Sequence, residues 1–298
     1  MEINFIKHTK IYLIISSSFV LLSVIILVAF GLQFGIDFTG GSILEIEYQD
    51  SRPSNQEIME KLAGLELGEI VIQPTGEKGV ILRMKEVSEE QHQEILGKLK
   101  ENRGLEELRF EAIGPVIGKE LRQKTIILII VSFIALLFYV AFAFRQISQF
   151  VSPWQYGIIS ILAIFFDVLI TISVFSLLGK LYNIQFNISI ITALLTILGY
   201  TINDKIIIFD RIRENLLKNR KVVNFDELIN QSLNQVLGRS LSTGFCTILV
   251  LILIFLFGGE TLRYFSLTLI VGIVVGTYSS IFLAPFVLVG WLKWRKKY

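Results

Sequence analysis

The hydrophobic residues of this chain are concentrated in long, nearly uninterrupted runs rather than in short amphipathic stretches. An α-helix needs roughly 20 apolar residues to cross a bilayer, and each run is near that length. The runs are residues 11–32, 125–144, 155–178, 187–209, 240–257 and 264–291. A cleavable signal peptide is the alternative for the first run, which is long for such a peptide and lacks a clear small-x-small site. The pattern predicts an α-helical polytopic membrane protein with six transmembrane helices.

The polar stretch between the first two runs has a different pattern, with short strand-like and helix-like segments. The predicted strands are 43–48, 69–73, 80–85 and 108–113, and the predicted helices are 54–63 and 88–102. Ser54 is a candidate N-cap, with Glu57 at capping-box spacing. The order β-α-β-β-α-β is that of a ferredoxin-like α+β domain, which by itself indicates no activity.

The pattern therefore divides the chain into three parts. We expect residues 1–34 to form the N-terminus and first transmembrane helix, and residues 35–120 to form the ferredoxin-like domain. Residues 121–298 are then a five-helix transmembrane domain with a polar loop at 210–239.

The positive charges of the short loops predict how the chain is oriented. One side carries Lys7, Lys10, Arg145, Arg211, Arg213, Lys218, Arg220, Lys221, Arg239, Lys293, Arg295, Lys296 and Lys297. The opposite short loops carry Lys180 and Arg263. Because positive charge accumulates in cytoplasmic loops, we expect both termini and the 210–239 loop in the cytoplasm and the 35–120 domain outside it.

Composition supports a membrane protein and offers little for an enzyme. The chain is 53% hydrophobic, with a mean hydropathy of +0.63, which exceeds that of ordinary soluble domains. Cys246 is the single cysteine, so no intrachain disulfide can form. His8 and His92 are far apart in sequence and are expected at the surface. We find no metal-binding cluster, nucleophile–base set or Gly-rich phosphate loop, and we expect no enzymatic activity, cofactor, metal or nucleic-acid partner.

One carboxylate, Asp204, lies inside the fourth apolar run, because the apolar residues 206–209 still follow it. A carboxylate at that depth is costly and typically marks an ion or proton pathway. Helical spacing gives it a small and polar stripe on the same side: Ser189, Thr192, Thr196, Gly199, Tyr200 and Asn203. Such a stripe is expected to face other helices or a wet cavity rather than lipid.

A second carboxylate and an arginine lie in other runs. Asp167 is ~15 Å into the third run at 1.5 Å per residue, with Thr171 on its face. Arg239 opens the fifth run, and Thr243 follows one turn later. An arginine near a buried carboxylate favours the charged form, whereas burial favours the neutral form, and a carboxylate between these tendencies can exchange a proton.

Each of these residues also has a structural interpretation. Arg239 could be an interface residue whose side chain snorkels to water, and we expect the same of Lys205. Asp167 and Asp204 could be structural hydrogen-bonding groups. Gly272 and Gly276 form a GxxxG pattern typical of helix packing.

Several motifs together resemble the SecF branch of the SecD/SecF family of protein-export membrane proteins, within the resistance-nodulation-division superfamily. The stretch 34–42 after the first run resembles the family's signature through Gly35, Asp37, Phe38, Gly40 and Gly41. Further matching segments are 199–204, 209–215, 234–243 and 257–260. The fourth-run pattern is Asn203-Asp204 rather than the Asp-Ala-Asn of SecD, so the resemblance is to SecF.

The resemblance implies a function and partners. The family pairs SecD with SecF as a heterodimer beside the SecYEG channel, and uses the proton-motive force to draw an unfolded polypeptide across after SecA has acted. It implies that Asp204 carries the proton, with Asn203, Arg239 and Thr243 near it and Asp167 with Thr171 as a second polar site. SecA and YajC are further candidate partners, lipid surrounds the helices, and sodium is the alternative coupling ion.

Two departures from the family pattern bear on this site. The residue after Asn-Asp is usually small in the family and is Lys205 here, and the usual His before the third-run Asp is Phe166. The Lys205 cation could lower the affinity of Asp204 for protons or snorkel away from it, and Phe166 removes a possible relay partner of Asp167 and makes a proton role for Asp167 less certain. The alternative functions are a small-molecule or lipid exporter of the same superfamily, which would need a larger porter region, and a structural scaffold of the translocon.

Overall fold

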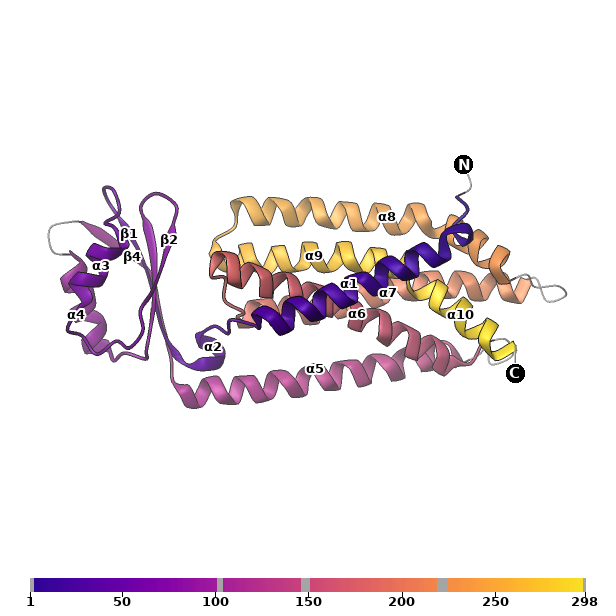
Figure 1. The fold of residues 1–298 in the computed structure, drawn as a ribbon, viewed down its shortest axis with the longest axis horizontal. Coiled ribbons are helices and arrows are strands. Elements are labelled where there is room, and N and C mark those ends of the chain that lie inside the picture. Colours follow the sequence, from indigo (N-terminus) through magenta and orange to yellow (C-terminus); the bar gives the residue numbers. More distant parts are fainter. Residues whose placement is uncertain (1–2, 101–103, 146–150, 219–224, 297–298) are drawn as a thin grey trace. The chain divides into compact units, whose positions relative to one another are not determined.

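The computed structural model describes residues 3–100, 104–145, 151–218 and 225–296. The chain forms two compact units (Figure 1). The first, here called the helical unit, comprises Met1–Leu32, Leu128–Ile184 and Ile188–Tyr298. The second, the α+β unit, comprises Gln33–Ile127 together with the short segment Gln185–Asn187.

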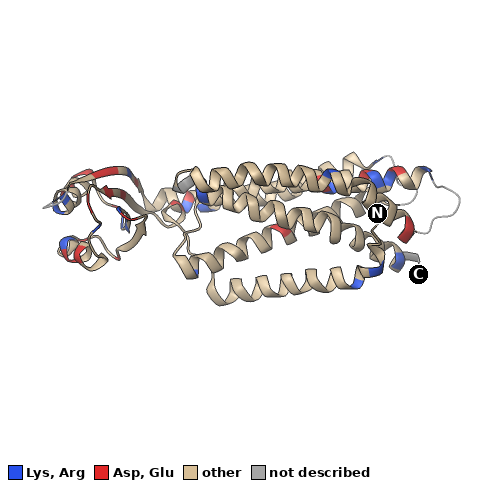
Figure 2. Cartoon of the chain, turned by 90° about the horizontal axis from the view of Figure 1, so that it is seen from above, with Lys and Arg blue, Asp and Glu red and all other residues tan. Residues whose placement is uncertain are grey.

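Within the described residues, six stretches are long and apolar enough to cross a membrane, as the sequence pattern predicts. The helices concerned are α1 (Thr9–Phe30), α5 (Pro115–Ala143), α6 (Pro153–Tyr182), α7 (Ile188–Lys218), α8 (Phe225–Phe257), α9 (Glu260–Phe282) and α10 (Ala284–Lys296). A short turn of 3-10 helix, Ile6–His8, precedes α1. Figure 2 shows that the charged residues of these long helices gather near the helix ends.

The last span, predicted over 264–291, is one stretch of membrane-crossing length, Leu262–Trp294, but its helix is interrupted at Leu283. Leu283, between α9 and α10, stays in the right-handed helical region but has a distorted φ of −113°. Pro285 explains the break, because proline lacks the N–H of a helical hydrogen bond and its ring clashes with the carbonyl four residues earlier. The signal was therefore present in the sequence.

The centre of the helical unit is formed by α6, α7 and the α9–α10 span. About half of the most apolar stretch of each is buried (50–56%), compared with 11% for α1 and α5 and 17% for α8. Glycines allow α9 to approach α7 closely: a Cβ added at Gly272 or Gly276 would lie 2.1 Å from a side-chain carbon of Ile197 or Thr201, respectively. This confirms the packing role expected of the GxxxG pattern.

The α+β unit has the predicted order of strands and helices. Its elements are α2 (Ile36–Thr39), β1 (Gly41–Tyr48), α3 (Asn55–Leu62), β2 (Val71–Thr75), β3 (Gly79–Met84), α4 (Glu89–Lys100) and β4 (Leu105–Ile113). The sheet order is β2-β3-β1-β4, and every pair is antiparallel. This is the ferredoxin-like arrangement. Ser54 caps α3 as predicted, since its Oγ accepts a hydrogen bond from the Glu57 N–H at 3.2 Å.

Details of this unit differ from the prediction. Strand β2 extends through Pro74 and Thr75, beyond the predicted strand 69–73, and the sheet accommodates Pro74 because β2 is an edge strand. His92 is buried at 4% exposure, stacked on Phe110 with ring centroids 3.7 Å apart, rather than at the surface. The end of the predicted 88–102 helix lies outside the described residues.

Candidate functional site

Asp204 lies midway along α7, a continuous helix that runs beyond the apolar run to Lys218. Its side chain is buried, with 2% exposure. Its Oδ2 atom has no hydrogen-bond partner among the residues that the structure describes. A buried polar atom without a partner is uncommon and calls for an explanation. The neighbouring Asn203 is exposed.

Lys205, the next residue, is directed into the helical unit. Its Nζ lies 2.7 Å from Oδ2 of Asp167 on α6, and both side chains are 0% exposed. The ammonium also lies 3.4 Å from the Ser280 hydroxyl on α9 and 3.5 Å from the Thr201 carbonyl. The ion pair therefore joins α6, α7 and α9.

The expectation that Lys205 snorkels to water was wrong. Consecutive residues of a helix point about 100° apart, so Lys205 faces α6 and α9 while Asp204 faces elsewhere. Asp167 offers a carboxylate within hydrogen-bonding distance inside the unit, and a paired buried charge needs no route to solvent. The sequence did contain a signal for this pair, since two opposite charges lie in separate apolar runs. Whether the two side chains meet, however, depends on how α6 and α7 are rotated about their own axes.

Thr171 is also buried near Asp167, on the next turn of α6. Its hydroxyl donates to the backbone carbonyl of Asp167 at 2.7 Å, a hydrogen bond within its own helix. The second oxygen of Asp167, Oδ1, has no partner among the described residues. The charge of Asp167 is therefore compensated by Lys205.

Contacts between α7 and α8 define which residues lie level with Asp204. The Tyr200 and Thr247 hydroxyls are 3.3 Å apart, and further along the Asn215 amide donates to the Ser232 hydroxyl at 2.8 Å. The two helices are thus antiparallel. One turn from Tyr200 leads to Asp204, and one turn back from Thr247 leads to Thr243, so these residues are level.

Arg239 lies one further turn along α8 and is exposed. No ion pair joins it to Asp204 in the part of the chain that the structure describes. Thr243 is also exposed, and its hydroxyl donates to the Arg239 backbone carbonyl at 2.9 Å. The structure thus brings Asp204 and Thr243 to one level and leaves Arg239 about 5.4 Å, one helical turn, away along the axis.

The polar stripe predicted on α7 is largely uncovered in this chain. Exposed polar residues also lie along one side of α8. The exposed members of the two helices are Thr192, Thr196, Gly199, Asn203, Arg239, Ser242, Thr243 and Cys246. Threonine hydroxyls on this surface bond to carbonyls of their own helix, as Thr196 does to Thr192 at 2.9 Å, which lowers the cost of exposing them to an apolar medium. This surface, here called the α7–α8 polar face, borders the buried Asp204.

The glycine motif lies in the α+β unit, apart from these charges. Gly40 and Gly41 have positive φ angles of 76° and 136°. Added Cβ atoms would lie 2.8 Å from Pro115 Cα and 2.7 Å from the Met84 carbonyl oxygen, respectively. Only glycine fits both requirements, so the motif forms a tight junction at the start of β1. Gly35 and Phe38 are buried within it, and Asp37 is half-buried.

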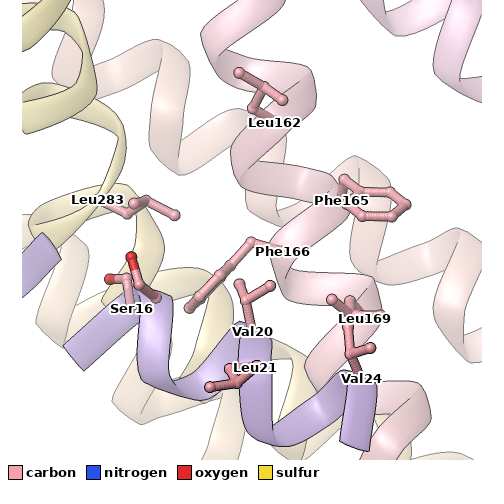
Figure 3. Close-up of a pocket in the computed structure, with 10 residues that line it drawn as sticks. Ser16, Val20, Leu21, Val24, Leu162, Phe165, Phe166, Leu169 and Leu283 are labelled. Carbon is pink, nitrogen blue, oxygen red and sulfur yellow. The ribbon is translucent and has the colours of Figure 1, made fainter. Parts of the chain in front are cut away.

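The helical unit also contains an open groove of about 450 Å³ between α1 and α6 (Figure 3). Its lining is almost entirely apolar, with Ser16 and Ser17 as the polar residues. Figure 3 shows Phe166 directed toward α1. The groove supplies no titratable group. Among the described residues, no group of His, Cys, Asp and Glu could hold a metal ion.

Comparisons with known proteins agree with these features. The sequence profile of the C-terminal region of the protein export membrane protein SecD/SecF matches residues 93–294. The profile of the SecD/SecF GG motif matches residues 25–51, which include the glycine junction.

Curated relatives match along nearly the whole chain. The protein translocase subunit SecF of Thermobaculum terrenum is 36% identical, with 97% of this chain and 94% of the relative aligned. The protein of the same name from Anaerolinea thermophila is 34% identical, with 98% of this chain and 96% of the relative aligned.

Solved structures give the same result for the fold. A crystal structure of SecDF, a translocon-associated membrane protein from a Thermus species, matches with a TM-score of 0.86 and 33% identity over 98% of this chain. A super-membrane-facing form of SecDF matches with a TM-score of 0.70 and 34% identity over the whole chain. This chain spans 39–40% of the length of those SecDF chains.

Proposed function

Because the chain belongs to the SecD/SecF family of protein export membrane proteins, we propose that it is a SecF-type accessory subunit of the Sec translocase that uses the proton-motive force. Asp204 is the group that carries the coupling proton. The observation that supports this most is the difference between the two buried carboxylates: Asp167 forms an ion pair with Lys205, whereas Asp204 forms none with the residues that the structure describes.

Charge balance explains why that difference matters. A buried carboxylate must be compensated by a cation or a proton, because an isolated buried charge is very costly. Lys205 fulfils this role permanently for Asp167. Asp204 has no cation within ion-pair distance in the described part of the chain, so the binding and release of a proton changes the charge of this region.

The residues beside Asp204 give the proton a route and the carboxylate an alternative partner. Thr243 is level with Asp204 and exposed on the α7–α8 polar face, and Asn203 lies on the same face. Arg239, one turn away on a long flexible side chain, reaches toward Asp204 when the carboxylate is charged and turns to water when it is neutral. This alternation shifts α7 against α8. Asp167 and Thr171 hold α6 in place rather than carry the proton.

The α7–α8 polar face is the surface on which SecD binds. In a bilayer, exposed hydroxyl, amide and guanidinium groups need a polar or protein environment. The solved relatives are SecDF chains of which this chain matches about two fifths, and we expect SecD to be the partner that covers this face. SecYEG and the unfolded polypeptide are the further partners, and SecA and YajC act with them.

Orientation follows from the distribution of positive charge. Both termini lie in the cytoplasm, and the α+β unit lies on the opposite side, where it meets the emerging polypeptide. The available energy is modest but sufficient, since one elementary charge moved through 100 mV is worth about 2.3 kcal/mol. Of the lysines and arginines that support this orientation, Arg220, Lys221 and Lys297 lie outside the described residues.

The test is preprotein export in vesicles with and without a proton gradient, for wild type and Asp204→Asn, each co-expressed with SecD at matched membrane levels. Asp210→Asn is the matched control, because it makes the same chemical change on the same helix at an exposed residue that pairs with Arg213. We expect Asp204→Asn to lose the gradient-dependent part of export and Asp210→Asn to keep it.

Equal export by wild type and Asp204→Asn under both conditions would contradict the proposal and favour a structural scaffold. Replacing the proton gradient by a sodium gradient in the same assay separates the two coupling ions, and we expect the sodium gradient alone to be ineffective.

A further inference from the structure

The segment between α6 and α7 belongs to the α+β unit although it is far from the rest of that unit in sequence. Residues Gln185–Asn187 are grouped with Gln33–Ile127. The Phe186 N–H donates to the Gln33 carbonyl at 2.7 Å, and the Gly35 N–H donates to the Phe186 carbonyl at 3.0 Å. Phe34 and Phe186 form a parallel β-bridge. We call these two paired segments, 33–35 and 185–187, the strap.

Aromatic packing reinforces the backbone pairing. The Phe34 ring meets the Phe186 ring edge-on with centroids 6.1 Å apart and the Phe38 ring at 5.8 Å. The Arg122 guanidinium lies 5.6 Å from the centre of the Phe34 ring. Phe186 is 5% exposed. The strap is therefore a packed element rather than a loose loop.

The same motif also meets the start of α5. An added Cβ at Gly40 would lie 2.8 Å from Pro115 Cα, and one at Gly118 would lie 2.9 Å from the Gly40 nitrogen. The stretch from Gln33 to Gly41 thus packs against residues 185–187 at one end and against the first turn of α5 and β3 at the other. A displacement of residues 185–187 acts on the α+β unit through this stretch.

No linker residue separates the strap from α7, the helix that carries Asp204. Asn187 is followed directly by Ile188, the first residue of α7, and three residues span at most about 10 Å. On the other side, Asn183 ends α6 in a left-handed conformation with φ of 54°. The chain also passes between the two units at the end of α1 and within α5. These two helices are peripheral, and neither carries Asp204 or Lys205.

We propose that the strap is the coupling element through which movement of α7 reaches the α+β unit. The proposal rests on the function proposed for Asp204. When α7 shifts, it pulls residues 185–187, and the paired segment 33–35 carries that movement into the glycine junction and β1. Phe34, Gly35 and Phe186 are positioning residues, since they act on the polypeptide through the α+β unit.

The first experiment inserts the flexible sequence Gly-Ser-Gly-Ser between Asn187 and Ile188 in the full chain, co-expressed with SecD. We expect the gradient-dependent part of export to fall to the level of Asp204→Asn, while gradient-independent export and membrane levels stay at those of wild type. The matched control places the same insertion between Gly258 and Gly259, in the α8–α9 connection, which belongs to the helical unit. We expect this control to behave as wild type.

The second experiment joins the strap covalently. Phe34→Cys and Phe186→Cys are combined with Cys246→Ser, which removes the chain's own thiol, and are linked by a short bis-maleimide. Because the strap stays paired while it transmits movement, the linked protein should keep gradient-dependent export. A linked protein that loses it would mean that the pair must separate, which contradicts the proposal.

The outcomes distinguish the strap from the function of Asp204. Gradient-dependent export that survives the 187–188 insertion but not Asp204→Asn overturns the strap and leaves the proposed function intact. Export that survives Asp204→Asn but not the insertion overturns the role of Asp204 and supports the strap. Equal losses from the 187–188 and 258–259 insertions would show a general effect of lengthening loops and overturn the strap.

Discussion

Asp167 and Asp204 lie on neighbouring helices of one unit and are almost equally buried, with 0% and 2% of their surfaces exposed. Their surroundings nevertheless differ. Asp167 has the Lys205 ammonium at 2.7 Å on the side of α7 that packs against α6 and α9. Asp204 has no ion pair within the described part of the chain and lies beside the exposed α7–α8 polar face.

This difference shows that burial alone does not identify a functional acid. Both carboxylates are unusual for an apolar helix, and sequence alone makes both candidates. What separates them is charge compensation: the lysine that departs from the family pattern neutralises one and faces away from the other. Under the proposed function, the Lys205 side of α7 contributes stability and the Asp204 side changes its charge. The following predictions test that division, beginning with the largest effect.

Removing one partner of the ion pair should be the most damaging substitution. Lys205→Met leaves the Asp167 carboxylate buried without its cation, and breaking a buried pair in this way typically costs about 3–5 kcal/mol. The double variant Asp167→Asn/Lys205→Met removes both charges and should recover most of that loss, because neutral replacements of a buried pair are often well tolerated. Thermal unfolding in detergent measures both.

If the double variant were as unstable as Lys205→Met, the pair would contribute by packing rather than by charge. The division between the two sides of α7 would then lose its electrostatic basis.

Close packing on the Asp167 side predicts sensitivity to added volume on α9. Gly276→Val introduces a Cβ that would lie 2.1 Å from Thr201 Cγ2, and overpacking typically costs about 1–3 kcal/mol. Gly290→Ala in α10 is the control, since an added Cβ there has no neighbour within 4 Å among the described residues. The shift in unfolding temperature should be clear for the first variant and near zero or positive for the second.

Loss of the hydrogen bond between α7 and α8 on the Asp204 side of α7 should lower the stability of the protein only slightly. Tyr200→Phe removes the hydroxyl that lies 3.3 Å from the Thr247 hydroxyl, and a single neutral hydrogen bond contributes about 0.5–1.5 kcal/mol. We expect a loss at the low end of that range in the same unfolding assay. A loss as large as that of Lys205→Met would mean that this side is as firmly held as the other.

Much of the fold could be predicted because its signals are local. Apolar runs of membrane-crossing length and the alternation of strand and helix patterns lie within short windows, and both were confirmed. The break at Leu283 was also readable, since Pro285 stands in the sequence. The predicted strand 69–73 ended too early, before Pro74, because a strand accommodates a proline only where it lies at an edge, and that is a property of the whole sheet.

The arrangement of the site was less predictable. Lys205 and Asp167 are 38 positions apart in sequence. Their pairing depends on the relative rotation of the two helices that carry them, and no local pattern encodes that rotation. The sequence analysis did not predict the strap for a similar reason. Residues 185–187 have no periodicity of their own, and Phe186 pairs with Phe34, which is distant in sequence. Burial of Asp204, in contrast, followed from its position among apolar residues.

The most direct test asks which carboxylate exchanges a proton. Infrared difference spectroscopy of the protein reconstituted with SecD in lipid, recorded between acidic and alkaline pH, follows the C=O stretch of protonated carboxyl groups. We predict that a pH-dependent carboxyl band of wild type persists in Asp167→Asn/Lys205→Met and is missing in Asp204→Asn. A band that persists in Asp204→Asn and vanishes in the double variant would assign the proton to Asp167 and contradict this account.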